Sequence, residues 1–241
     1  MSNIRYETDG PVATLCLDRP EKLNAVTTDM LQAMTAALDE AAADDEIRVL
    51  VLRGEGRAFS AGFDLEWDEN DPAANSAAAI REQLERDFAS IMRFWDFPKP
   101  IIAAVHGYCL GSTMEIVSVC DITIAAEDCR FGAPEVTFGS GMVCLILPWI
   151  IGQKNARELL LVGRKDLGAE RALAMGLVNK VVPGDELLDA ANAMAAEIAK
   201  NDPLAVQLTK KAINHSIETA GLRKALEDAL EIDIEIETRG T

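Results

Sequence analysis

In the first half of the chain, short strand-like apolar segments alternate with segments whose apolar positions recur at helical spacing. The segments IRYET and VATLCL lie on either side of the turn signal DGP and predict a hairpin of two strands. Residues 28–43 repeat apolar side chains at helical spacing, so we expect one helix there. The next apolar run, IRVLVLRG, is short and bounded by glycine, which is typical of a strand buried on both faces.

The alternation of strands and helices continues and then gives way to helices. After a helical pattern that ends at FPKP, the segment IIAAVHG predicts a strand, STMEIVSV a short helix and DITIAAED another strand. Beyond Phe138 the segments PWIIG, NARELLLVG and GAERALAMG predict helices, and two long Ala- and Leu-rich patterns follow Asp185 and Asp202. Together these elements predict an α/β core over residues 1–185 and a helical region over residues 186–241.

Composition and charge narrow the class of ligand. The chain has 241 residues, 49% of them hydrophobic and 26% charged, which is typical of one large globular domain or two small ones. Its formal net charge of −17 argues against a nucleic-acid surface, because phosphate backbones are bound by clustered Lys and Arg. Any anionic ligand must be held by local groups that act against this overall negative field.

No segment predicts a membrane anchor or an oxidising compartment. The N-terminal residues MSNIRYETDG lack the basic and apolar regions of a signal peptide, and the longest apolar stretch, MVCLILPWII, has about half of the roughly 20 residues that a membrane helix needs. The five cysteines are scattered and mostly within apolar runs: Cys16, Cys109, Cys120, Cys129 and Cys144. We therefore expect reduced thiols in a cytoplasmic protein, without disulfides or a metal site.

Two glycine-containing loops are candidates for a site that binds a polarised carbonyl. In GEGRAFSAGFDL a buried-type strand runs into small residues, and Gly62 has no side chain to keep a ligand from the neighbouring backbone N–H groups. In HGYCLGSTME a strand ends just before a helix, where the N–H of Ser112 lacks an intrahelical partner. Two such donors suit the oxygen of an enolate or of a tetrahedral thioester intermediate. Taken alone, each loop is better explained as an ordinary turn.

Glu115 is an ionisable residue on an otherwise apolar helical segment. A lone buried carboxylate is costly, so this group should be neutral, paired or at the wall of a cavity, on the helix face that it shares with Gly111 and Ser112. Glu135, in CRFGAPEVTFG, reads by itself as a surface loop residue. At close range, however, the two carboxyls could act as an acid and base pair.

Other catalytic arrangements have less support in the sequence. Ser60 does not lie in a G-x-S-x-G elbow, which disfavours a serine hydrolase. His106 and Cys109 would point to different faces of a continuing strand, and no third partner is evident for a cysteine nucleophile. We therefore assign no catalytic role to these three residues.

Four collinear segments resemble the enoyl-CoA hydratase/isomerase (crotonase) superfamily. They are DRPEKLNAV, GRAFSAGFDL, PKPIIAAVHGYCLGSTMEIVSVCDITIAAEDCRFGAPEV and ARELLLVGRKDLGAERALAMGLVNKVV. The resemblance covers nearly the whole chain and implies a crotonase-like α/β spiral of repeated strand–strand–helix units with a helical C-terminal trimerisation region. It also implies a homotrimer or a dimer of trimers that binds an acyl-CoA thioester, with CoA as part of the substrate and no separate cofactor.

The resemblance implies roles for individual positions. It puts the two backbone donors of an oxyanion hole at Phe63 and Ser112 and the two hydratase glutamates at Glu115 and Glu135. The positions that match substrate- and CoA-binding segments are Lys22, Leu23, Ala25, Ala61, Phe63, Asp64, Leu65, Leu110, Gly111, Pro134 and Gly139. The residues expected to line the acyl pocket are Met142, Cys144 and Trp149. Because few cations lie near these segments, and not because of the resemblance, Lys22 and Arg57 are the candidate phosphate contacts.

The implied reaction is syn addition of water to an α,β-unsaturated thioester. Glu115 would orient and deprotonate the water, while Glu135 would deliver a proton to the α-carbon. Family isomerases commonly manage with one glutamate, at the position of Glu135, so the presence of Glu115 favours a hydratase. The alternatives are an isomerase, dehydratase or hydrolase of another acyl-CoA, a non-catalytic CoA-ester binder, and an RNA-binding role that the acidic balance disfavours.

Three segments depart from the family pattern. Gly111-Ser112-Thr113 stands where many hydratases have three consecutive glycines, and FGSGMVCLILPW replaces a Pro-Gly-Gly-rich loop that helps to wall the acyl site. The sequence also ends at EIETRGT, before the last helix of most relatives, so we expect the CoA contacts of that helix to be missing or replaced. The loop difference predicts an unusual acyl group.

Overall fold

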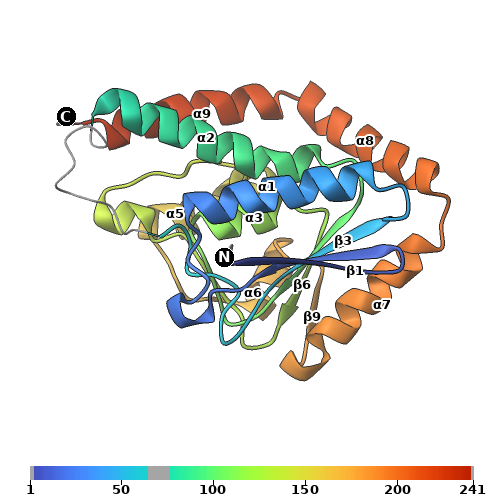
Figure 1. Cartoon of the computed structure of the whole chain (residues 1–241). Helices are drawn as coiled ribbons and strands as arrows, with labels where there is room; N and C mark the ends of the chain where they lie inside the picture. The colour runs from blue at the N-terminus through green and yellow to red at the C-terminus, as the bar shows by residue number, and fades with distance from the viewer. Residues whose placement is uncertain (1–2, 65–75, 240–241) are drawn as a thin grey trace.

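Most strands of the protein belong to one large sheet. The computed structural model describes residues 3–64 and 76–239 (Figure 1), so Leu65, a predicted substrate contact, lies outside the described residues. The sheet has six strands in the order β1-β2-β3-β4-β6-β9; β1 and β2 are antiparallel, and the other neighbours are parallel. These strands are β1 (Ile4–Asp9), β2 (Val12–Leu17), β3 (Val49–Gly54), β4 (Ile101–Val105), β6 (Ile122–Ala126) and β9 (Lys180–Val182).

A second, smaller sheet has the order β5-β7-β8. Its strands are β5 (Tyr108–Leu110), β7 (Arg130–Gly132) and β8 (Leu167–Gly168). The chain visits the two sheets in turn: β4 is followed by β5 and the helix α3 (Ser112–Val119), and β6 is followed by β7. A backbone bridge between Ser60 and Cys109 joins the segment after β3 to this smaller sheet. The chain therefore repeats strand–strand–helix turns, as the resemblance implies.

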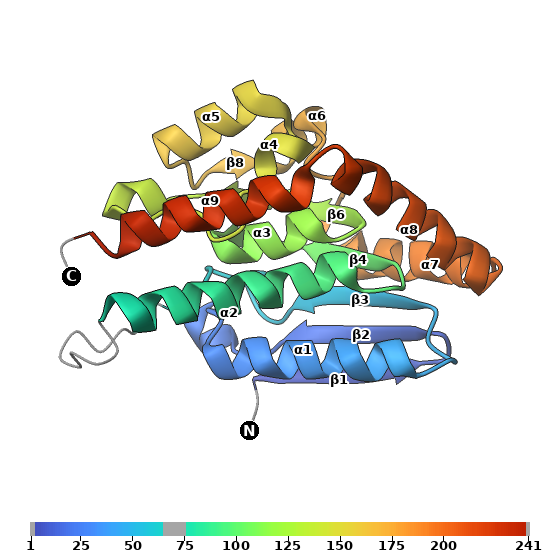
Figure 2. The same cartoon turned by 90° about the horizontal axis from the view of Figure 1, so that it is seen from above.

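Helices cover both faces of the large sheet, because its central strands are apolar on both sides. The covering helices are α1 (Thr28–Ala43), α2 (Ala77–Asp96) and α3 on one face and α7 (Leu187–Ala199) on the other (Figures 1 and 2). In β3, Leu50 and Leu52 belong to the core under the first group, whereas Val49 and Val51 belong to the core under α7. This two-sided burial confirms the strand predicted for IRVLVLRG.

The C-terminal region contains one more helix break than the sequence pattern predicts. The long pattern after Asp202 is divided at Gly221, whose φ of 103° is in the left-handed region, and α9 then returns alongside α2 (Figure 2). The Arg81 guanidinium holds the two helices together with two hydrogen bonds of 2.8 Å to the Glu231 carboxylate. The remaining helices are α4 (Leu147–Ile150), α5 (Gly152–Val162), α6 (Ala169–Met175), α8 (Pro203–Thr219) and α9 (Leu222–Glu237), with the short 3-10 turns η1 (Pro20–Lys22), η2 (Glu135–Phe138) and η3 (Gly184–Glu186).

All five cysteines lie in the described part of the chain. All five cysteines are free, and four of them are buried. Across residues 3–64 and 76–239, no helix combines the length and the apolar character that crossing a bilayer requires.

Candidate active site

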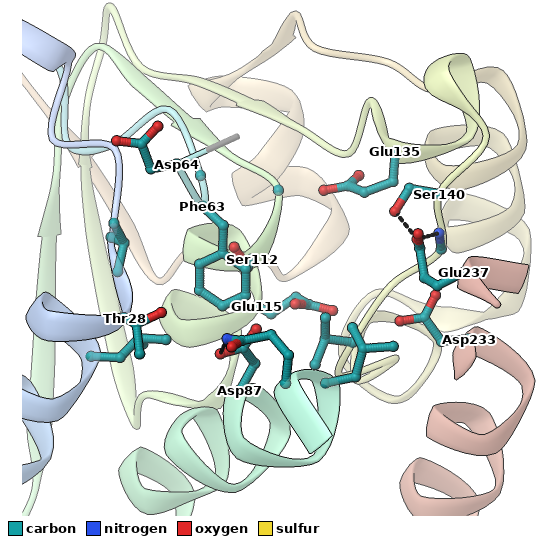
Figure 3. A pocket seen from close by; sticks show the side chains of 18 of the residues that line it. Thr28, Phe63, Asp64, Asp87, Ser112, Glu115, Glu135, Ser140, Asp233 and Glu237 are labelled. Atoms are coloured by element: carbon teal, nitrogen blue, oxygen red, sulfur yellow. Dashed lines mark hydrogen bonds between the residues drawn. The ribbon is translucent and has the colours of Figure 1, made fainter. Parts of the chain in front are cut away.

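A cavity of about 680 Å³ lies between the loop residues 61–64, the segment 134–143 and the helices α1, α2, α3 and α9 (Figure 3). The ionisable side chains that line it are all acidic: Asp64, Asp87, Glu115, Glu135, Asp233 and Glu237. Within the described part of the chain, no lysine, arginine or histidine lines this cavity. An anionic group that enters must therefore be held by neutral donors, such as backbone N–H groups, hydroxyls, the Gln83 amide or protonated carboxyls.

Two backbone turns meet at one wall of the cavity. Gly62 (φ 102°) and Gly111 (φ 57°) both adopt the left-handed conformation that favours glycine. A Cβ added to Gly62 would lie 3.1 Å from the carbonyl oxygen of Leu110, so the two turns are close enough to disfavour a side chain there. The two glycine-containing loops, GEGRAFSAGFDL and HGYCLGSTME, are therefore neighbours in space.

Phe63 and Ser112 follow these glycines, and each has an uncommitted N–H. The parallel bridge between Val26 and Phe63 uses the N–H groups of Val26 and Asp64, so the N–H of Phe63 points to the other side. Ser112 is the first residue of α3, where an N–H has no intrahelical acceptor. Within the described residues neither N–H donates a hydrogen bond, and both residues line the cavity. The buried Ser112 Oγ has no partner there either.

Asn24, to which sequence reasoning gave no role, holds the first turn in place. Its Nδ2 donates to the carbonyls of Glu55 and Ala58, both at 2.8 Å, and its Oδ1 accepts from the Arg19 N–H at 2.8 Å. Its own carbonyl accepts from Ser60 Oγ at 2.7 Å. The hydroxyl of Ser60 is thus committed to the backbone of this turn.

Glu115 is buried at the base of the cavity, with a side chain that is 1% exposed. Its Oε1 accepts a hydrogen bond of 2.7 Å from the backbone N–H of Cys144. Burial raises the pKa of Glu115 well above its ordinary value, and repulsion from Glu135 and Asp233 acts in the same direction, whereas the Cys144 N–H lowers it. The apolar helix therefore makes this carboxylate more basic than an exposed one.

Glu135 begins η2 and faces the same cavity from a different element (Figure 3). Its carboxyl lies over Gly111: a Cβ added to that glycine would be only 2.6 Å from Glu135 Oε1. Its Oε2 is buried and has no partner among the described residues. Burial, together with repulsion from Asp233, raises the pKa of Glu135 to about 7. Glu135 is therefore a carboxyl that can hold a proton at neutral pH.

Three further acids of the cavity, Asp87, Asp233 and Glu237, were not found from the sequence. Burial raises the pKa of Asp87 to about 6 against a hydrogen bond from Gln83. Burial and the neighbouring Glu237 raise the pKa of Asp233 to about 7, and the amide of Gly141 opposes that rise. Helical spacing could have found Asp233, because it falls on the buried face of α9, which is otherwise apolar.

The structure brings only part of the predicted residues to the cavity. Those that line it are Ala61, Phe63, Asp64, Gly111, Ser112, Glu115, Pro134 and Glu135. Predicted residues that do not line it are Lys22, Leu23, Ala25, Arg57, Leu110, Gly139, Met142, Cys144 and Trp149.

Met142, Cys144 and Trp149, which the resemblance places at the acyl pocket, do not line this cavity. The side chain of Cys144 is fully buried and packs against Met92, so only its backbone N–H serves the site. Trp149 lies on α4 with 40% of its surface exposed. Residues on the cavity side of the same loop are Ser140, Gly141 and Val143.

We expect the protein to unfold at a higher temperature at pH 5.5 than at pH 8. The folded-state pKa values of Asp87, Glu135 and Asp233, about 6, about 7 and about 7, exceed the value of about 4 in an unfolded chain. Between these values the folded state binds more protons, so its stability falls as pH rises. Thermal unfolding followed by circular dichroism at both pH values measures this difference.

The contribution of one group can be isolated by substitution. Asp233→Asn removes a buried charge and should raise the unfolding temperature at pH 8 by several degrees, with little change near pH 4. Glu235→Gln, at an exposed position of α9, is the matched control and should change the midpoint far less. A wild-type protein that is more stable at pH 8 than at pH 5.5 would contradict the raised pKa values.

Known proteins share both the sequence and the fold of this chain. Residues 7–236 match the model of a protein family described as enoyl-CoA hydratase/isomerase. The chain is 37% identical over 226 residues to the 2,3-dehydroadipyl-CoA hydratase of Escherichia coli, covering 91% of this chain and 85% of the relative. It is 36% identical over 225 residues to the short-chain-enoyl-CoA hydratase of Clostridium acetobutylicum, covering 90% of this chain and 83% of the relative.

The solved structures include a close counterpart. The crystal structure of an enoyl-CoA hydratase/isomerase from Xanthobacter autotrophicus Py2 is 46% identical, has a TM-score of 0.94, and covers 100% of this chain and 89% of that one. This match confirms the predicted crotonase-like fold. Because the family model spans almost the whole sequence, the chain belongs to the enoyl-CoA hydratase/isomerase family.

Proposed function

We propose that the protein is an enoyl-CoA hydratase that adds water syn across the double bond of an α,β-unsaturated acyl-CoA thioester. The proposal is carried by the presence of Glu115 and Glu135 at one cavity, beside two backbone N–H groups without acceptors in the described residues. Addition of water needs one group to activate the water and one to protonate carbon, and the cavity offers both. Two of the relatives above are named as hydratases, which supports the same reaction.

In this mechanism the thioester carbonyl accepts hydrogen bonds from the N–H groups of Phe63 and Ser112. Negative charge develops on that oxygen as water attacks the β-carbon, so donors that are already oriented stabilise the transition state more than the substrate. Loss of one such donor in comparable sites costs about 3 kcal/mol. The side chain of Ser112 does not prevent this role, because the donor is its backbone N–H.

The two glutamates divide the acid and base work. Glu115 orients and deprotonates the water: burial raises its pKa and makes its carboxylate a stronger base, while the Cys144 N–H holds that carboxylate in place. Glu135 holds the proton and delivers it to the α-carbon. Burial and mutual repulsion oppose ionisation of both carboxyls at once, so the pair retains a proton near neutral pH.

The CoA portion is assigned to the remaining predicted contacts. Ala61, Asp64 and Pro134 line the cavity beside the thioester position, and the exposed Lys22 and Arg57 are the candidate phosphate contacts. CoA is part of the substrate, and the reaction needs no separate cofactor. The homotrimer or dimer of trimers and the cytoplasmic location stay predictions from the resemblance and the composition.

The test is a panel of trans-2-enoyl-CoA esters of increasing acyl length. Hydration destroys the conjugated thioester, so we expect loss of its ultraviolet absorbance and a product heavier by the mass of water. A shifted double bond without added water would instead identify an isomerase. Binding without turnover across the panel would identify a CoA-ester binder.

A further inference from the structure

Asp233 is a buried carboxyl without a well-formed hydrogen bond, because the adjacent Gly141 N–H donates to Glu237 Oε1, at 3.3 Å. Its side chain is 2% exposed and lines the cavity, and neither carboxylate oxygen accepts a hydrogen bond from a described residue. A buried polar group that is left unsatisfied carries the full cost of its desolvation. A ligand that brings a donor to Asp233 would remove that cost.

The position of Asp233 determines which part of a substrate it meets. In Figure 3, Glu115 and Glu135 lie between Phe63 and Asp233. All three carboxyls line the same cavity, and the charge of Asp233 raises the pKa of both glutamates. A thioester with its carbonyl at Phe63 and its double bond between the glutamates directs the rest of its acyl chain toward Asp233.

The other acids near this end of the cavity already have donors. Glu237 accepts a hydrogen bond from Ser140 Oγ, and Asp87 accepts one of 2.8 Å from Gln83 Nε2. Because no cationic side chain of the described residues lines the cavity, Asp233 has no counter-ion there. The cavity thus presents a negative, hydrogen-bond-accepting end to the acyl chain.

The surroundings of Asp233 leave room for a short chain with a polar end. A Cβ added to Gly141 would overlap Asp233 Oδ1, so glycine allows the carboxyl to lie against the backbone. Ile80, Leu84 and Val143 line the same cavity and offer apolar contacts to methylene groups. An acyl group that is apolar in the middle and a donor at its end matches both features.

We propose that Asp233 is a specificity-determining residue that recognises a hydrogen-bond donor, a hydroxyl or an ammonium group, at the distal end of a short acyl chain. The inference rests on the proposed function for the position of the thioester. A purely apolar chain leaves Asp233 unsatisfied, and the ionised form of Asp233, which predominates at a pH above its raised pKa of about 7, repels a terminal carboxylate. Both are therefore disfavoured substrates.

The test compares thioesters of equal length that differ in one terminal group. trans-Hex-2-enoyl-CoA ends in a methyl group. In trans-5-hydroxypent-2-enoyl-CoA a hydroxyl takes the place of that methyl group, and in trans-5-aminopent-2-enoyl-CoA an ammonium group does. We expect kcat/KM of the wild type to be roughly tenfold to a hundredfold higher for at least one donor thioester. The two donor arms distinguish a neutral from a charged group. An equal or higher kcat/KM for the hexenoyl ester would overturn the proposal.

Variants of Asp233 separate recognition from a structural role. Asp233→Leu should reverse the preference, and Asp233→Asn, which keeps an acceptor but loses the charge, should weaken the preference for the amino ester more than that for the hydroxy ester. Glu235→Gln, at an exposed position of α9, is the matched control and should leave the ratios unchanged. Each result is a ratio within one variant, so a partly unfolded preparation does not alter it. An equal loss for all three thioesters would show a merely structural role and overturn the proposal.

Failure of the hydratase proposal gives a different result from failure of this inference. If the wild type hydrates none of the three thioesters, the proposed reaction is wrong, and their dissociation constants then decide the specificity. Tighter binding of a donor thioester that is lost in Asp233→Leu would support recognition by Asp233. Equal dissociation constants for all three would overturn it.

Discussion

Glu115→Gln is expected to lower kcat for hydration by about 10²- to 10⁴-fold, the range that a positioned general base contributes. Glutamine has the shape of glutamate and keeps an oxygen that can accept the hydrogen bond from the Cys144 N–H, so the fold of the site should be retained. It cannot take a proton from water. Steady-state kinetics with the best enoyl-CoA ester of the panel measure the loss.

The division of this loss between kcat and KM tests the assignment. Glu115 contacts the water rather than CoA in the proposed mechanism, so KM should change little while kcat falls. Glu127→Gln, an exposed position after β6, is the matched control and should retain wild-type kinetics. Turnover of Glu115→Gln close to that of the wild type would rule out Glu115 as the base.

Glu135→Gln should lower kcat to a similar degree, and it should also change the pH dependence of the residual activity. Glu135 must be protonated to deliver a proton to the α-carbon, and its raised pKa is about 7. Its protonated fraction falls as pH rises through that value, so hydration by the wild type should decline on the alkaline side. In Glu135→Gln this alkaline decline should disappear, because glutamine does not titrate.

The pH profile distinguishes a catalytic from a structural role for Glu135. A variant that is merely misfolded would lose activity at every pH and keep the wild-type profile. Restored activity in Glu135→Asp, with the alkaline decline present again, would support proton delivery by a carboxyl. An unchanged alkaline decline in Glu135→Gln would instead assign the titration to another group.

Local sequence patterns predicted most of the helices and strands. The helix expected at residues 28–43 forms with those bounds as α1, because apolar side chains recur on one face. At its start, the Thr27 side chain caps the helix by accepting a hydrogen bond from the Met30 N–H. The strand expected in IRVLVLRG forms as β3, because an apolar run of that length suits burial between two helical layers.

The candidate site was predicted only where local chemistry is unusual. Glu115 stood out because a carboxyl on an apolar helix has few acceptable environments. Asp87 lies on a helix rich in charged residues, where one more acid resembles a solvated position, whereas the helical spacing of α9 places Asp233 on its apolar face. Met142, Cys144 and Trp149 were expected at the cavity because their segment matches one that helps to wall the acyl site in relatives, but a continuous apolar segment has no period that tells which of its side chains face inward.

The sequence by itself determined most of the helices and strands, the order in which they follow one another and Glu115, a carboxyl on an apolar helical segment, because periodicity and burial of a lone charge act over a few neighbouring residues. Only the tertiary structure decided which groups meet in the cavity. Because α9 packs alongside α2, Asp233 and Glu237 lie next to the loop that contains Gly141. The Gly141 N–H donates a hydrogen bond to Glu237, which is 96 positions away in the sequence. No local period encodes such a contact, because its stability depends on the packing of the whole core.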